Sequence, residues 1–173
     1  MDRPNRSIMV LAVHTLGGPR LGRMLLDLAA ERPTSFHFVV PSTIPEYGWT
    51  WTEAQVERDA RRRLAVHLEF SRTLGLDVDG EIAPAEPEEA VRRLSAGQPF
   101  DQLIVVRRRR PLSQFHRSTA RALTQLEAEG LLVTMLRADA PMEVAADFDI
   151  RRIRTDFLRW AASSGATGLI AAV

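Results

Sequence analysis

The chain has 173 residues, of which 45% are hydrophobic and 26% charged, and this composition is that of a folded globular protein with room for one α/β domain. The 22 acidic residues nearly balance the 23 basic ones, all of them arginine, and a net charge of +1 gives no support to nucleic-acid binding. The absence of cysteine excludes disulfides, thiol catalysis and thiolate metal sites. No apolar run reaches the roughly 18 to 20 residues of a membrane-spanning helix. We therefore expect a cytoplasmic protein.

The first part of the chain has two predicted strands separated by a helical pattern. Residues 8–13 are continuously apolar and rich in β-formers, which is typical of a central parallel strand. Residues 35–40 (SFHFVV) are predicted to form the second strand. Between them, Leu21, Leu25 and Leu28 recur on one face of a predicted helix.

A long helix is predicted from residue 53 to about residue 74. Thr52 and Gln55 have the spacing of a capping box at its start, and Gly75 ends the pattern. The residues that this helix is expected to bury are Val56, Ala60, Leu64, Leu68 and Phe70. Its arginine-rich stretch, residues 58–63 (RDARRR), is expected to be a solvent-exposed face.

The second half continues the alternation of strands and helices. Residues 76–83 alternate weakly, as an edge strand does, and a short helix is predicted over 87–97. Residues 103–106 form a buried strand, residues 118–129 a helix and residues 131–136 a fifth strand. Repeated β-α units with right-handed crossovers predict an open, doubly wound, parallel five-stranded sheet with helices on both faces.

Three segments carry a resemblance to a known family. They are MVLAVHT at residues 9–15, AEPEEAV at residues 85–91, and DQLIVVRRRR with the RSTARAL that follows it, at residues 101–110 and 117–123. In their order and spacing, over roughly Ser7 to Asp139, they resemble the universal stress protein family. The resemblance implies a fold that binds ATP in some members. In those members, an Asp at the end of the first strand approaches the adenosine part of ATP. After the fourth strand, a motif made of Gly-x-x-Gly, nine further residues and Gly-Ser/Thr wraps the phosphates.

This sequence departs from that ATP motif at nearly every point. His14 stands where the Asp is expected, Arg107 and Arg110 replace the paired glycines, and Arg117 takes the place of the third. Only six residues separate Arg110 from Arg117, and Ser118 alone keeps the family's residue type. We therefore predict that ATP binds weakly or not at all and that no cofactor is needed. These five residues are the candidate anion or degenerate nucleotide site.

The arginine run 107–110 has three interpretations. It is a discarded glycine loop, or an anion site in which guanidinium groups replace backbone N–H groups, or a nucleic-acid contact. Few aromatic residues flank the run for base stacking, so we predict no nucleic-acid partner and keep a small anion or phosphate as a potential ligand. Gln102, inside the segment DQLIVV, is interpreted as a minor change from the family's pattern.

The histidines, serines and threonines form no catalytic pattern. His37 is interpreted as a residue at the edge of the core, and no two histidines have metal-ligand spacing with a carboxylate. We therefore predict no catalytic residue and no metal site. The favoured function is a stress-related regulatory or binding module that is not an enzyme. The alternative is a nucleotide- or phosphate-binding enzyme of the adenine-nucleotide-binding α/β group, using the arginine loop.

Beyond the predicted domain, residues 1–139, the chain continues with an extension over residues 140–173. It consists of a linker, a predicted amphipathic helix over 148–162 with flanking arginines, and an apolar tail. The helix is expected to pack on its own domain or on a partner subunit, with contact to a membrane surface as the alternative. Strand 131–136 leaves an open sheet edge, and the resemblance implies a homodimer that pairs it.

Overall fold

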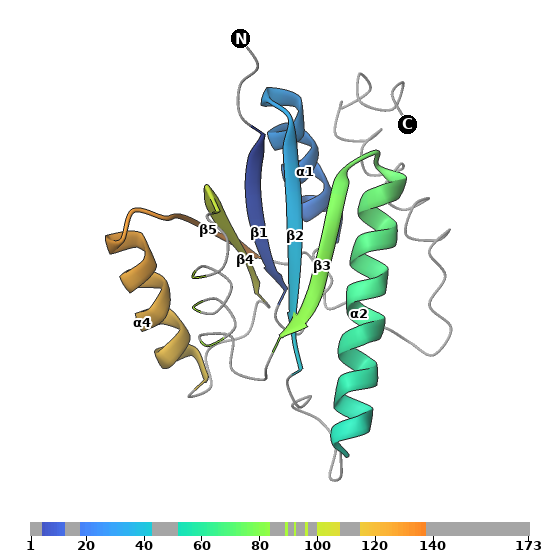
Figure 1. Ribbon diagram of the computed structural model, residues 1–173, viewed down its shortest axis with the longest axis vertical. Helices are drawn as coiled ribbons and strands as arrows, with labels where there is room; N and C mark the ends of the chain where they lie inside the picture. Colours follow the sequence, from blue (N-terminus) through green and yellow to red (C-terminus); the bar gives the residue numbers. More distant parts are fainter. Residues whose placement is uncertain are drawn as a thin grey trace.

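The computed structural model of the chain describes residues 5–12, 18–42, 52–83, 89, 92, 96, 100–107 and 115–137 (Figure 1). Its sheet has five strands in the order β3-β2-β1-β4-β5, and every neighbouring pair is parallel. The strands are β1 (Arg6–Ala12), β2 (Thr34–Pro41), β3 (Asp77–Ala83), β4 (Gln102–Arg107) and β5 (Leu132–Arg137). This topology confirms the doubly wound sheet predicted from the sequence.

The described helices cover both faces of the sheet. They are α1 (Gly18–Glu31), α2 (Glu53–Thr73) and α4 (Phe115–Ala128). Alternate residues of a strand face opposite sides, so Ile8 and Val10 of β1 pack with Leu25 of α1 and Phe70 of α2. Their neighbour Met9 packs on the other face with Leu123 of α4. Each central strand therefore has helices on both sides, and this explains why its sequence is apolar without interruption.

Helix α2 begins as predicted, with the capping box in place. The backbone N–H of Gln55 donates to Thr52 Oγ1 at 3.3 Å, and the N–H of Thr52 donates to Gln55 Oε1 at 2.8 Å. The predicted burial of Val56, Ala60 and Phe70 is confirmed, and Leu64 and Leu68 are partly buried. Gly75 has a φ of 74°, a conformation that glycine adopts without strain, and it follows the helix end as predicted.

Some predicted elements lie outside the described residues. The helix over 87–97 is described only at residues 89, 92 and 96, and the extension from residue 140 is not described. None of the described helices is both long and apolar enough to cross a lipid bilayer.

Candidate functional site

The predicted site belongs to the carboxyl edge of the sheet, where ligands of open α/β sheets bind. The strand order reverses between β1 and β4, and Arg107 is the last residue of β4 at this point. Arg117 and Ser118 lie in the first turn of α4. For these three residues the structure describes the backbone, and His14 and Arg110 lie outside the described residues. The grouping of the five as one site stays a prediction.

Helix α4 begins earlier than the sequence pattern indicates. Its first residue is Phe115, three positions before the predicted start at Ser118. The first N–H groups of a helix have no intrahelical acceptor, and here they belong to residues ahead of Ser118. Ser118 therefore lies within the first turn and not at the very start of the helix. The prediction placed the start too late because an apolar residue, Phe115, opens the helix.

The strand register brings a further arginine to this edge. The Cα of Arg107 is paired with that of Arg137, the last residue of β5. Neighbouring strands lie about 4.8 Å apart. Arg137 is exposed. Sequence reasoning missed Arg137 because the two residues are far apart along the chain, and only the register of β4 against β5 places them side by side.

Arg63 shows that the prediction of a solvent-exposed face for residues 58–63 is wrong at one position. Its side chain is buried, with only 7% exposure. Nε donates to Asp59 Oδ2 at 2.9 Å, and Nη2 donates to the carbonyl oxygen of Pro41 at 3.2 Å. Arg63 therefore holds the carboxyl end of β2 against α2. Because this acceptor lies on another element, the local pattern of charges could not reveal it.

A second tie joins the ends of β2 and β3. Both the N–H and the hydroxyl of Ser42 donate to the carbonyl oxygen of Ala83, each at 3.1 Å. With the Arg63 contact to Pro41, this fixes the carboxyl end of β2 on two sides. The end of β2 is therefore tied both to α2 and to β3.

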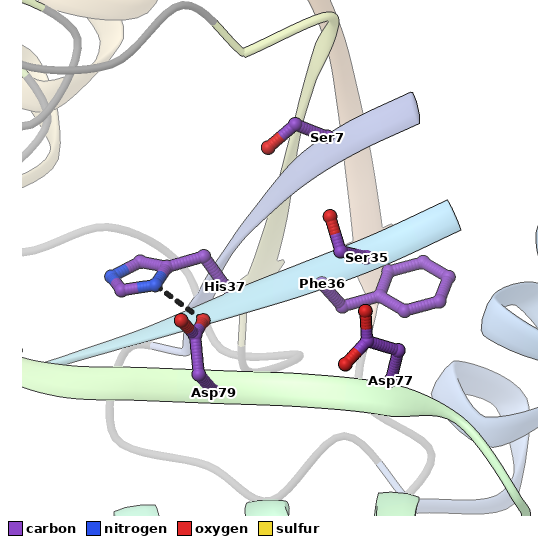
Figure 2. A pocket seen from close by; sticks show the side chains of 6 residues that line it. All are labelled: Ser7, Ser35, Phe36, His37, Asp77 and Asp79. Carbon is purple, nitrogen blue, oxygen red and sulfur yellow. Dashed lines mark hydrogen bonds and ion pairs between the residues drawn. The ribbon is translucent and has the colours of Figure 1, made fainter. Parts of the chain in front are cut away.

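The opposite, amino edge of the sheet carries a small polar cavity (Figure 2). Its volume is about 130 Å³, and it is lined by Ser7, Ser35, Phe36, His37, Asp77 and Asp79. These residues come from the three neighbouring strands β1, β2 and β3. The register pairs Ser7 with Ser35, Ser35 with Asp77, and His37 with Asp79. The register therefore places these paired residues on one face of the sheet, where they line the cavity.

His37 and Asp79 form the main polar contact of this cavity. His37 Nδ1 lies 2.6 Å from Asp79 Oδ1, and the side chain of Asp79 is 79% exposed. The imidazole ring also lies 6.0 Å, centroid to centroid, from the ring of Phe100. The interpretation of His37 as a residue at the edge of the core agrees with its half-buried position, but its carboxylate partner was not predicted.

This pair does not extend into a nucleophilic triad within the described residues. Ser35 Oγ donates to the carbonyl oxygen of Arg6 at 3.4 Å, and His37 Nε2 is buried with no hydrogen-bond partner. Activation of a serine requires a hydrogen bond from its hydroxyl to the imidazole. Among the residues that the structure describes, no group of three or more His, Asp or Glu side chains could hold a metal ion.

Gln102 has a role that the sequence did not indicate. Its Oε1 accepts from Arg6 Nη2 at 2.6 Å, and its Nε2 donates to Thr134 Oγ1 at 2.8 Å. Arg6 also contacts Glu31 Oε2 at 3.4 Å. Gln102 is buried, with 5% of the residue exposed. Gln102 therefore links β1 to the terminal strand β5 inside the protein, and the interpretation of this residue as a minor change is wrong.

Comparisons with known proteins agree with this architecture. No protein-family model and no curated protein sequence matches the chain. Among solved structures, a universal stress protein from Archaeoglobus fulgidus is similar with a TM-score of 0.52 and 16% identity, over 75% of this chain and 93% of that one. A protein from the universal stress protein family from Burkholderia pseudomallei is similar with a TM-score of 0.47 and 15% identity, over 74% of this chain and 94% of that one. The similarity to the Archaeoglobus fulgidus structure shows that the chain has the fold of a universal stress protein.

Proposed function

We propose that the chain is a stress-related regulatory or binding module of the cytoplasm, not an enzyme, whose nucleotide site binds ATP weakly or not at all. The proposal rests on one observation: Arg107 is the last residue of β4, at the carboxyl edge of a sheet with the fold of a universal stress protein. The family resemblance implies glycine there, because backbone N–H groups must approach the phosphates closely. A Cβ and a long side chain obstruct that approach.

The five candidate residues support binding of a small anion better than binding of ATP. Guanidinium groups grip phosphate oxygens through paired N–H donors, and they do so without close approach of the backbone. Arg107, Arg110 and Arg117 supply such groups, and Ser118 adds a hydroxyl near the start of α4. His14, which replaces an acidic residue, removes the acceptor that the resemblance implies for adenosine. The proposed domain spans residues 1–139, and residues 140–173 form the extension.

We also propose a homodimer formed through β5. This strand lies at one edge of the sheet, and Leu132 and Met135 on it are exposed at 55% and 46%. An apolar edge strand with unpaired backbone groups favours pairing with another chain. In a two-fold dimer both copies present the same surface, so β5 of one subunit would face β5 of its partner.

The test of the binding function is titration calorimetry of the full chain with ATP, with and without magnesium. The expected result is no saturable heat, or weak binding that magnesium does not strengthen. A dissociation constant in the low micromolar range would overturn the proposal. A variant in which Arg107 and Arg110 are both replaced by Gly serves as the control. If ATP binding appears only in that variant, the arginines themselves are what excludes the nucleotide.

A further inference from the structure

The polar cavity at the amino edge of the sheet presents oxygen atoms from three strands (Figure 2). The register places Ser7 of β1, Ser35 of β2 and Asp77 of β3 in one row, and Asp79 follows on the same face of β3. Neighbouring strands lie about 4.8 Å apart, so one small group above Ser35 is within reach of both neighbours. The Ser35 hydroxyl already donates to the carbonyl oxygen of Arg6 at 3.4 Å, which leaves it as an acceptor. The cavity therefore suits an occupant that donates hydrogen bonds.

The cavity also carries negative charge. Its described lining contains the carboxylates of Asp77 and Asp79 and no arginine. Asp77 is exposed, and none of the residues that the structure describes forms a hydrogen bond or an ion pair with its carboxylate. The carboxylate of Asp79 contacts His37 Nδ1 at 2.6 Å. The charge state of His37 therefore decides how much negative charge remains.

The surroundings of His37 favour one form of its imidazole ring. Nδ1 lies against Asp79, whereas Nε2 is buried and has no hydrogen-bond partner within the described part of the chain. A proton on Nε2 would be a buried donor without an acceptor, and this costs free energy. The form with a single proton, on Nδ1, avoids that cost and carries no charge. The carboxylates of Asp77 and Asp79 then attract a cation from outside the protein.

We propose that this cavity binds the ammonium group of a small aliphatic amine. A primary ammonium has three N–H donors and a positive charge, which match the hydroxyls of Ser7 and Ser35 and the carboxylate of Asp77. The volume of about 130 Å³ is that of about four water molecules, enough for the ammonium and its first methylene groups. A metal ion is not favoured, because the described residues contain no group of three or more His, Asp or Glu that could hold one. The chain has no lysine, so a second copy offers no such side chain.

The experiment is a titration of the ¹⁵N-labelled full chain with butylamine, which is protonated at neutral pH, followed by the NMR shifts of the backbone amides. We expect saturable shifts at residues 7, 35, 37, 77 and 79 with a Kd in the millimolar range, weakened by added salt. Tetramethylammonium has the same charge and no N–H donor, so it should bind about tenfold more weakly. The amide of Nα-acetyl-lysine carries the same ammonium group on a peptide unit. Tighter binding of this compound than of butylamine would assign the site to a lysine side chain and overturn the assignment to a free amine.

Asp77→Asn keeps the size of the side chain and removes its charge, and it should weaken butylamine binding about tenfold. Asp77→Glu keeps the charge and should weaken it less. The control is Glu69→Gln, which removes an exposed carboxylate from α2 on the opposite face of the sheet and should leave binding unchanged. Far-UV circular dichroism should report the same fold for all variants.

Three results would overturn the amine site. They are the absence of localised shifts with butylamine, equal binding of tetramethylammonium, and wild-type binding by Asp77→Asn. The site lies at the edge of the sheet opposite to the proposed anion site, and none of these results depends on ATP. The proposed function and the amine site therefore stand or fall separately.

Discussion

Gly80 occupies a position where the sheet and α2 approach each other closely. It lies on the edge strand β3 and is paired with Phe38 of β2. A Cβ at residue 80 would collide with the carbonyl oxygen of Phe38 and would lie 2.9 Å from Leu64 Cδ1 and 3.0 Å from Phe38 Cβ. The Leu64 side chain can rotate, but the Phe38 backbone is fixed in the ladder. The change Gly80→Ala therefore tests whether this packing governs stability.

Two effects of opposite sign decide the size of the change. Replacement of glycine by alanine restricts the unfolded chain, and this stabilises the fold by about 0.4 to 1 kcal/mol. Overpacking of a filled interior destabilises it by about 1 to 3 kcal/mol, and the upper part of this range applies because the closest atom belongs to the backbone. We expect a net loss of about 2 kcal/mol in the free energy of unfolding. This corresponds to a fall of about 4 to 8 °C in Tm.

Urea unfolding followed by far-UV circular dichroism measures the loss directly. Gly75→Asn is the matched control, since a Cβ at Gly75 meets nothing within 4 Å and asparagine tolerates its φ of 74°. This control should shift the unfolding midpoint much less than Gly80→Ala does. If Gly80→Ala is as stable as the wild type, or if Gly75→Asn destabilises more, the reasoning from close packing is refuted.

Three further predictions concern the polar contacts and the sheet edge. Gln102→Leu should lower the free energy of unfolding by about 1 to 3 kcal/mol in urea titrations, because Arg6 and Thr134 lose their partner inside the protein; equal or greater stability would show that this link contributes nothing. Arg63→Met should also lower the free energy of unfolding by about 1 to 3 kcal/mol, because the carbonyl oxygen of Pro41 loses its donor. It should speed proteolysis after β2, and an unchanged cleavage pattern would contradict the role given to the Pro41 contact. Light scattering should give the mass of a dimer for the wild type and of a monomer for Leu132→Asp, and a monomeric wild type would refute the pairing of β5.

The sequence predicted the elements of the fold because their signals are local. The apolar runs of the central strands and the capping box at Thr52 and Gln55 depend on residues that are neighbours in the chain. Burial of the strands on both faces then follows from the β-α alternation. Where a local signal was weak, as at the start of α4, the predicted boundary differs from the observed one by three residues.

The chemistry at the sheet edges could not be predicted because its partners are distant in the chain. Arg6 and Gln102 are 96 residues apart, and His37 and Asp79 are 42 apart. Arg63 sits among charged residues, so its pattern indicates solvent, yet its acceptor is a backbone carbonyl on β2. The pairing of Arg107 with Arg137 requires the register of two strands. A sequence pattern contains neither distances nor register.

The two edges of the sheet differ in charge, and this asymmetry bears on which ligand the fold attracts. The amino edge exposes the carboxylates of Asp77, Asp79 and Asp101, and Arg32 there already lies 4.0 Å from Asp101. The carboxyl edge ends in Arg107 and Arg137. Fields of exposed charges fade over about 10 Å at ordinary ionic strength, so each edge acts on a ligand through its own residues and not through the net charge of +1. The exposed carboxylates therefore disfavour a small anion at the amino edge, and the proposed function places anion binding at the opposite edge, which the parallel arrangement of the strands keeps apart from them.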